Sequence, residues 1–508
     1  MISVWDVFLG HCRQDKNAIA VHDDRGRTWS RADLSQQADR VGDHLKGLGV
    51  GPGDAVLICM PNRVDWMAAY LGTLSLGAVP GTVPVTHDAT AIAASMRQIG
   101  AATLLISTRH RSRDFAAELP AIAHELGSEL RAILFDDESG DVSEARIGGE
   151  SSKAVGLPQG TVHILFSSST TGEPKAIAHS EESLTAYNIG IIDRYGVTGA
   201  DTIFMPSPLG HSTGVWHGVR MSLLTGAALI IQDTWDPVRA LQIVEEHRAR
   251  VTVAATPFLK DLVECPWEGA VKLRHLRTFL CGGAQVPPEL LSQAAKELPA
   301  TFVGSVWAMS EGGATCSMPG DSPDAVTTTC GLPLPGVQLK TIDCHGADNP
   351  PTVQGELVMR TPSLCLGYVR QEELFASCFT PDGFFRTGDQ AVIDADGYMT
   401  ITGRIKDIII RGGVNIGPVP IENAVLAHPD VREVAVVGKP DPRLGERICA
   451  VVVTHSGSTL RHSELTGLLA STDLPKRYWP EDVVTIASLP KTPAGKVQKR
   501  LLVSALWN

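Results

Sequence analysis

Short apolar runs alternate with amphipathic helical patterns through most of the first 400 residues, and this alternation limits the possible folds most strongly. Residues 29–47, for example, read as a helix with Leu34, Ala38, Val41 and Leu45 on one stripe. Strand-like apolar runs recur at 55–60, 103–107, 132–135, 161–166, 227–231, 251–255 and 278–281. Such alternation predicts α/β layers around largely parallel sheets.

The pattern changes after Gly331, where glycine and proline separate shorter β-type runs. These runs predict a small, more antiparallel, β-barrel-like subdomain. A second unit of strands and helices begins near Lys406, after the candidate junction at 402–407. We therefore expect an α/β protein with a large N-terminal domain of layered sheets and this subdomain at 1–403. A small mobile α+β C-terminal domain would follow at 404–508.

Charge and composition exclude several classes of protein. The net charge of −12 argues against a chain that mainly coats nucleic acid. The longest apolar stretches are too short to span a bilayer, and the N-terminus shows no signal peptide. Residues 406–508 carry 13 basic against 10 acidic side chains, so a basic end accompanies an acidic body. Such an end suits an anionic substrate, or is a chance imbalance on a solvated face.

The cysteines and histidines show no metal-binding spacing. None of the 10 cysteines forms a C-x-x-C pair, and none of the 16 histidines lies in H-E-x-x-H. We therefore expect reduced thiols in a cytoplasmic protein without a zinc site built from its own side chains.

A loop rich in hydroxyl groups follows the strand pattern that ends at Phe166. The sequence Phe166-Ser-Ser-Ser-Thr-Thr-Gly-Glu-Pro-Lys175 offers hydroxyls, backbone N–H groups and one ammonium, which together can surround phosphate oxygens. It is not a Walker A loop, because G-x-x-x-x-G-K-[ST] is absent. A solvated Ser/Thr turn is the alternative, and composition alone favours it.

The sequence Gly210-His-Ser-Thr-Gly214 matches the G-x-S-x-G nucleophile elbow and raises the alternative of a serine hydrolase with Ser212 as nucleophile. An elbow requires a central strand directly before it. Two prolines in 205–209 argue against such a strand. The hydrolase is therefore a remote alternative.

Three further residues could bind a nucleotide. Asp389, expected in a turn, could accept ribose hydroxyls, and Glu311 beside two glycines could hold Mg²⁺. Lys496, in a Pro/Gly loop near the C-terminus, could neutralise charge that develops on a phosphorus centre. Each has a simpler explanation: a turn-forming Asp, a surface acid and a basic tail.

The order of these motifs resembles that of the adenylate-forming enzymes, the superfamily of acyl-CoA synthetases, peptide-synthetase adenylation domains and firefly luciferases. Residues 166–175, 281–284, 307–311, 385–389, 403–407 and 490–496 carry the resemblance, which covers nearly the whole chain. The stretches 232–237 and 255–259 are most similar to medium-chain and alicyclic ligases of the cyclohexanecarboxylate-CoA ligase type.

The resemblance implies a two-step ligase with ATP, Mg²⁺ and coenzyme A. A carboxylic acid, small or medium and hydrophobic, alicyclic or aromatic, would first become an acyl-adenylate. Coenzyme A thiol would then displace AMP. An enzyme that loads an acyl-carrier protein or an amine is the alternative.

The resemblance also implies roles for individual residues. Catalysis is assigned to Lys496 between acyl carboxylate and α-phosphate, His211 at the gate between acyl pocket and thiol channel, and Glu311 as metal ligand. The β- and γ-phosphates would lie in a loop formed by Ser167, Ser168, Ser169, Thr170, Thr171, Gly172 and Lys175. The rest of the cofactor site would comprise Gly283, Ala284, Gln285, Trp307, Ala308, Met309, Ser310, Asp389, Ile401, Arg404, Lys406, Gly412 and Gly413.

Within that set, Trp307 would stack on adenine, Ser310 would contact the α-phosphate, and Asp389 with Arg404 would bind the ribose. Lys406 would be the hinge, and Gly412 with Gly413 would admit pantetheine. The chain also departs from the usual motifs. Ser169, Ala176, Ala308 and Ser310 replace commoner Gly, Gly, Gly and Thr. An added Cβ restricts φ, so nucleotide affinity is expected to fall or the loop to change shape.

Overall fold

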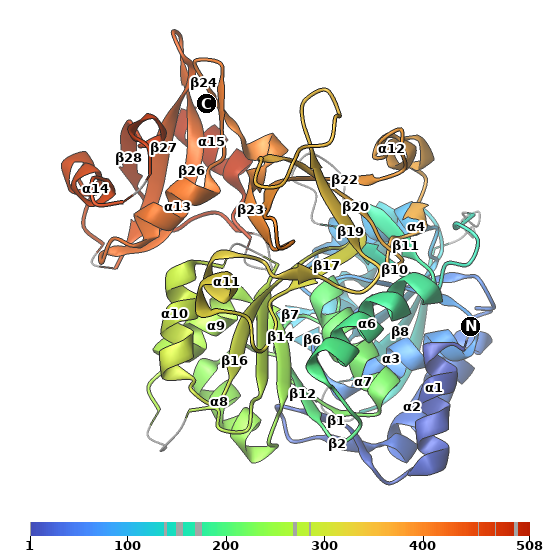
Figure 1. Cartoon of the computed structure of the whole chain (residues 1–508). Helices are drawn as coiled ribbons and strands as arrows, with labels where there is room; N and C mark the ends of the chain where they lie inside the picture. The colour runs from blue at the N-terminus through green and yellow to red at the C-terminus, as the bar shows by residue number, and fades with distance from the viewer. Residues whose placement is uncertain are drawn as a thin grey trace.

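The computed structural model describes residues 2–136, 140–148, 156–167, 175–267, 272–283, 286–455, 457–472, 474–491 and 496–507. Two large sheets and their helices form the main body, and two smaller sheets follow in the chain (Figure 1). This arrangement confirms the expected α/β class with a large N-terminal part and a smaller C-terminal one. Within the described residues, no helix is long and apolar enough to cross a membrane.

The first large sheet has nine strands in the order β18-β17-β16-β15-β14-β12-β13-β1-β2. Its strands are β1 (Ile19–Asp23), β2 (Thr28–Ser30), β12 (Thr202–Met205), β13 (Ala228–Ile231), β14 (Val251–Ala255), β15 (Thr278–Gly282), β16 (Phe302–Met309), β17 (Gly312–Cys316) and β18 (Leu332–Pro333). Strands β13, β12, β14, β15 and β16 are parallel, so their carboxyl ends share one edge. Ligands of α/β proteins bind at such an edge.

The second large sheet has eight strands in the order β21-β11-β10-β4-β3-β5-β8-β9. They are β3 (Ala55–Cys59), β4 (Val79–Thr82), β5 (Thr103–Ser107), β8 (Leu130–Phe135), β9 (Val142–Ile147), β10 (His163–Phe166), β11 (Ala176–His179) and β21 (Gly367–Tyr368). A two-stranded ribbon, β6 (Arg109–His110) and β7 (Arg113–Asp114), stands apart. The apolar runs of the sequence are therefore largely the buried parallel strands.

Helices cover both large sheets. They are α1 (Val4–Gln14), α2 (Arg31–Gly47), α3 (Val64–Ser75), α4 (Ala89–Ile99), α5 (Phe115–Leu126), α6 (Glu181–Tyr195), α7 (Met221–Thr225), α8 (Pro237–Glu246), α9 (Thr256–Glu264), α10 (Pro288–Glu297) and α11 (Pro323–Thr328), with a π-helical turn η1 (Gly214–Arg220). Helix α2 begins at a capping box in which the Ser30 hydroxyl accepts from the Asp33 N–H. Its four expected core residues are all buried, which confirms the stripe.

The small subdomain is a four-stranded antiparallel sheet in the order β19-β20-β22-β23. Its strands are β19 (Gln338–Ile342), β20 (Gly355–Arg360), β22 (Phe385–Ile393) and β23 (Met399–Arg404), with helix α12 (Glu372–Ser377) beside it. The antiparallel pairing was expected, but the turn at residues 385–389 was not found. That stretch lies inside β22, where an irregular register with β20 and a positive φ at Gly388 accommodate the glycine.

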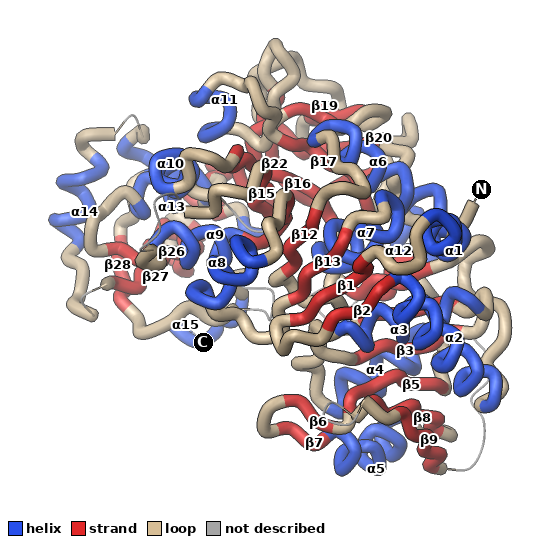
Figure 2. Tube along the Cα trace, turned by 90° about the horizontal axis from the view of Figure 1, so that it is seen from below, coloured by secondary structure: helices blue, strands red, loops and turns tan. Residues whose placement is uncertain are grey.

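The C-terminal part forms its own sheet and core. It contains η2 (Ile405–Asp407), β24 (Ile409–Arg411), β25 (Val414–Ile416), α13 (Val419–Leu426), β26 (Val431–Asp441), β27 (Gly445–Thr454), α14 (His462–Leu469), η3 (Lys476–Tyr478), β28 (Asp482–Thr485) and α15 (Lys499–Trp507). Figures 1 and 2 show this part beside α9 and α10. There the Lys260 ammonium donates to the Arg432 carbonyl at 3.1 Å.

Candidate active site

A cavity of about 800 Å³ lies at the carboxyl edge of the nine-stranded sheet. Loops after β12, β13, β14, β15 and β16 supply one wall. Residues from the eight-stranded sheet, the small sheet and the C-terminal part supply the other, including Lys175, Glu356, Arg404 and Lys496. Segments far apart in the sequence therefore meet around one space.

One end of the cavity holds the described part of the hydroxyl-rich loop. Ser167 and Lys175 both line the cavity, and the Ser167 N–H donates to the Lys175 carbonyl at 3.0 Å. The expected phosphate-binding residues between them, Ser168, Ser169, Thr170, Thr171 and Gly172, lie outside the described residues.

Glu311 occupies a tight turn between β16 and β17 and is buried, with 7% exposure. Its carboxylate accepts from the Tyr368 hydroxyl at 2.8 Å, and the Lys175 ammonium lies 4.4 Å from the centre of the Tyr368 ring. Burial, with Glu311 alongside, raises the pKa of Tyr368, so the phenol remains a donor. Glu311 is therefore an oriented acid inside the cavity, not the surface charge that a loop position allows.

The backbone of the neighbouring Ser310 is also held in place. Its carbonyl accepts from His179 Nε2 at 2.8 Å, and burial lowers the pKa of His179 to about 4, which keeps the ring neutral. A Cβ on Gly282 would lie 2.2 Å from the Val306 carbonyl oxygen, so β15 and β16 approach closely only because this residue is glycine. Gly283 lines the cavity at φ +77° and faces open space.

Asp389 lies just behind the cavity wall, with 4% exposure. One carboxylate oxygen accepts from Arg404 Nε at 3.0 Å, and the other accepts from the Trp307 indole N–H at 2.9 Å. Arg404 and Gly388 line the cavity. Trp307 packs into the core of the small sheet and does not line the cavity. Its observed contact is therefore with Asp389, and stacking on adenine stays a prediction.

Lys496 reaches the cavity from the C-terminal part. Burial, followed by the nearby charges of Arg404 and Lys406, lowers the pKa of its ammonium to about 8; Asp389 and Asp407 act in the opposite sense. Burial also lowers the pKa of Lys406, which sits in η2 and lines the same space. Partly buried cations gathered around one cavity are an arrangement suited to an anionic ligand.

His211 lies near Lys496, and burial together with that cation lowers its pKa to about 4. The ring is neutral at ordinary pH, and its Nδ1 accepts from the Thr213 N–H at 3.3 Å. Ser212 Oγ is 3.5 Å from the same nitrogen, and among the described residues no carboxylate is hydrogen-bonded to the ring. Six residues separate the end of β12 from Ser212, so the strand–turn–helix of a nucleophile elbow is missing.

The other end of the cavity is aromatic and is formed partly by η1. Tyr187 stacks on Trp216 with ring centres 4.4 Å apart, and its hydroxyl is 3.0 Å from His217 Nε2. Burial lowers the pKa of His217 to about 3, so it is neutral. Trp235 and Phe258 form an edge-to-face pair with ring centres 4.6 Å apart and complete the wall.

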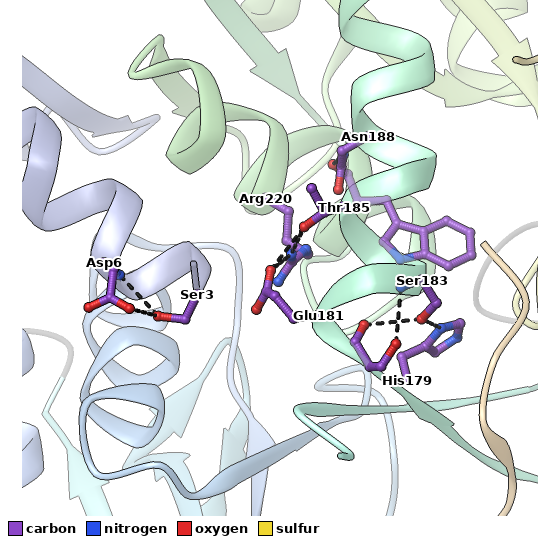
Figure 3. Close-up of polar contacts among 10 residues, drawn as sticks. Ser3, Asp6, His179, Glu181, Ser183, Thr185, Asn188 and Arg220 are labelled. Carbon is purple, nitrogen blue, oxygen red and sulfur yellow. Dashed lines mark hydrogen bonds and ion pairs between the residues drawn. The ribbon is translucent and has the colours of Figure 1, made fainter. Parts of the chain in front are cut away.

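Buried polar contacts fix η1 against α6 (Figure 3). Arg220 is fully buried, pairs with Glu181, and donates to Thr185 at 3.2 Å. The Asn188 side-chain amide donates to the Trp216 carbonyl at 2.7 Å. These contacts hold the aromatic side chains of η1 at the cavity.

The remaining expected residues fall into three groups. Ala308 and Met309 line the cavity with Ser310. Ala284 and Gln285 lie outside the described residues. Ile401 packs into the core of the small sheet, and Gly412 with Gly413 forms the turn between β24 and β25, so these three do not line the cavity.

Sequence reasoning missed Tyr368, Trp235 and Asp261 as functional candidates. Tyr368 lies in a two-residue strand that pairs with β11, and only this pairing brings it to Glu311. The Trp235 indole N–H donates to Asp261 at 2.7 Å across 26 residues. The stretch 232–237, which carries the finer resemblance, contains Trp235 but has no motif that marks its role.

Known proteins resemble this chain over nearly its full length. A family profile described as AMP-binding enzyme matches residues 8–369, and one described as AMP-binding enzyme C-terminal domain matches 420–496. The medium-chain fatty-acid–CoA ligase of Escherichia coli K12 is 30% identical, covering 98% of this chain and 90% of the relative. The salicyl-AMP ligase / salicyl-S-ArCP synthetase of Mycobacterium tuberculosis is 32% identical, covering 94% and 85%. The crystal structure of ATP-bound MatB from Rhodopseudomonas palustris aligns with TM-score 0.87 at 26% identity, covering 99% and 98%.

Proposed function

The chain belongs to the AMP-binding enzymes, and on that premise we propose that it is an AMP-forming acid–thiol ligase. ATP and a carboxylic acid give an acyl-adenylate and pyrophosphate. The thiol of coenzyme A then attacks the acyl carbonyl and AMP leaves. The observation that carries this proposal is the position of Lys496, which enters from the C-terminal part and shares one cavity with Lys175, Glu311 and Arg404.

The first step needs charge neutralisation, because a carboxylate and a triphosphate repel each other. Lys496 is assigned to the acyl carboxylate and α-phosphate, and Lys175 to the outer phosphates. Both residues line the one cavity, so their ammonium groups would need little reorganisation during the reaction. Ser310 is assigned to the α-phosphate, and its carbonyl is already held by His179.

The nucleoside is assigned to the side of the cavity formed by β15, β16 and the small sheet. Gly283, Ala308 and Met309 line the cavity there and are assigned to the base. Arg404 and the carboxylate of Asp389 are assigned to the ribose. Trp307 keeps that carboxylate oriented, because its N–H donor occupies one oxygen and leaves further lone pairs for hydroxyls.

Glu311 fits a role in holding Mg²⁺, because it is an oriented carboxylate that projects into the cavity near Lys175. The described residues contain no cluster of three or more metal-ligating acidic, histidine or cysteine side chains. A single carboxylate suits Mg²⁺, which commonly binds one or two carboxylates together with substrate phosphates. The ion would neutralise phosphate charge when bound.

We assign the thiol step to a second orientation of the C-terminal part relative to the N-terminal part. We place the domain boundary between 403 and 404 and the hinge at Lys406, within η2. Rotation there would withdraw Lys496 and bring Gly412 and Gly413 to the cavity. This proposal fits the position of their hairpin outside the cavity now. Domain motions of this kind complete catalytic sites and often limit turnover.

The acid is proposed to be hydrophobic and to carry a single charge. Every Lys, Arg, Asp or Glu known to line the cavity lies on the phosphate and ribose side: Lys175, Glu311, Glu356, Arg404, Lys406 and Lys496. A second carboxylate or an ammonium at the aromatic end would be buried without an oppositely charged partner among the described side chains that line the cavity. Dicarboxylic acids and amino acids are therefore poor candidates.

A second candidate differs only in the acceptor. The relative whose name includes salicyl-S-ArCP synthetase favours a carrier-protein thiol in place of coenzyme A. Pyrophosphate exchange with a panel of acids tests adenylation, and acyl-CoA formation then tests the acceptor. Exchange without thioester formation would favour the carrier protein. A complete lack of acid-dependent exchange would overturn both candidates.

A further inference from the structure

Trp235 lies in the loop after β13 and lines the cavity. Along the nine-stranded sheet, β13 is four strands from β16, or about 19 Å at the usual strand spacing. The nucleotide side chains gather at the β16 end and on the small sheet. The β13 end is therefore where the part of the acid most remote from its carboxylate would lie.

Two residues of one helix fix the Trp235 ring. Asp261 accepts its indole N–H at 2.7 Å, and Phe258 packs edge-to-face against the ring with 4.6 Å between ring centres. Phe258 and Asp261 are three residues apart on α9 and thus share one face of that helix. Trp235 and Phe258 remain only partly buried while lining the cavity, so ring surface is available there.

From this geometry we propose that Trp235 is the specificity-determining residue for the acyl group and that Asp261 is its positioning residue. The inference rests on the proposed function. A fixed indole at the end of the cavity limits the length of the acid and offers an aromatic surface. It therefore selects compact carboxylic acids with a flat, uncharged ring over long linear ones. Aromatic contacts contribute beyond simple area burial when their geometry is fixed.

The test is acid-dependent pyrophosphate exchange, which reports adenylation without coenzyme A. The probes are benzoate, cyclohexanecarboxylate, hexanoate and octanoate. For the unmodified chain, we expect kcat/KM for benzoate to exceed that for the similarly sized cyclohexanecarboxylate ~3- to 10-fold. In Trp235→Leu we expect this preference to disappear. The octanoate-to-benzoate ratio should rise ~10-fold, a typical value for pocket discrimination among apolar groups.

Asp261 provides the matched pair of variants. Asp261→Asn keeps an oxygen that can accept the indole N–H, and should retain most of the unmodified acid profile. Asp261→Leu removes the acceptor and should move the profile toward that of Trp235→Leu. Thermal unfolding of each variant reports whether it is folded. If Trp235→Leu does not fold, Trp235→Phe replaces it in the same comparison of acids. The KM for ATP should remain within ~2-fold throughout, because the nucleotide end is unchanged.

The outcomes separate this inference from its premise. If unmodified chain exchanges pyrophosphate but Trp235→Leu lowers all four acids equally, or changes none, the specificity role is wrong while adenylation stands. Identical profiles for Asp261→Asn and Asp261→Leu would overturn the positioning role. If unmodified chain, tested also with a wider acid panel, shows no exchange with any acid, both the proposed function and this inference fail.

Discussion

The two ends of the cavity are built in opposite ways. At the nucleotide end, charged and polar side chains from three sheets and the C-terminal part converge, and partners such as Tyr368 and Trp307 hold the acids in place. At the acyl end, uncharged side chains follow the carboxyl ends of β12, β13 and β14, and they include aromatic, hydroxyl and imidazole groups. One end is organised around charged side chains, and the other around uncharged, largely aromatic surfaces that hydrogen bonds hold in place.

This difference teaches what each end can control. Changes at the nucleotide end should alter adenylation of every acid by the same factor, because every acid meets the same phosphates. Changes at the acyl end should reorder the acids and leave ATP unaffected. The following predictions test that division, beginning with the largest effect.

Replacing Lys496 with Ala should lower the rate of adenylation by ~10³-fold for every acid, because one preorganised positive charge is lost at the reacting centre. Pyrophosphate exchange measures this loss. Thioester formation from added acyl-adenylate should stay within ~3-fold, since our proposal withdraws Lys496 from that step. Lys491→Ala is the control, because Lys491 pairs with Glu433 at 2.6 Å and does not line the cavity. Equal loss of both half-reactions in Lys496→Ala would contradict the proposal.

Replacing Tyr368 with Phe should lower kcat for adenylation ~10- to 50-fold, the usual cost of losing a hydrogen bond to a charged group. The ring and its contact with Phe375 remain, so folding should be retained. The Mg²⁺ concentration for half-maximal exchange should rise, because Glu311 loses its orienting donor. Tyr195→Phe, which removes a hydroxyl bonded to the Ser317 carbonyl, is the matched control and should leave exchange unchanged. Loss confined to one acid would argue against this assignment.

Adenylation should decline as pH rises through about 8. The pKa of Lys496 in the ligand-free protein is about 8, below its ordinary 10.5, so the required ammonium is lost above that value. kcat/KM should fall ~10-fold per pH unit well above 8. His211, with a pKa of about 4, adds no step in this range. Lys496→Arg should be slower but lack the decline, because an arginine remains charged; the same decline in that variant would assign it to another group.

Replacing Ala308 with Gly should produce the smallest change. The Cβ of Ala308 stands where related motifs commonly have glycine, and Ala308 lines the cavity. Its removal should lower the KM for ATP at most ~3-fold, with the order of acids unchanged. The same variant should lose about 0.5–1 kcal/mol of stability, because glycine weakens a strand. A changed order of preference among the acids would place Ala308 at the acyl end. It would also contradict the separate control of nucleotide and acid by the two ends.

Much of the fold follows from local pattern. The apolar runs at 55–60, 103–107 and 251–255 became buried strands because a run with no polar face must be covered on both sides. The prediction of a turn at 385–389 was wrong. A glycine followed by a polar residue is typical of a turn, but the same pair also occurs where the register of a strand shifts. Pairing with β20, which lies over twenty residues earlier, decided between the two.

The sequence by itself determined the alternation of strands and helices, the change of pattern after Gly331, and the ordered motifs that carry Lys175, Glu311, Asp389 and Lys496. Local periodicity is enough for this, because strand and helix repeats are properties of neighbouring residues. Only the tertiary structure decided which side chains meet. Tyr368 reaches Glu311, Trp307 holds Asp389, and Asp261 fixes Trp235 through contacts that no spacing in the chain encodes, since sheet order and domain placement set them.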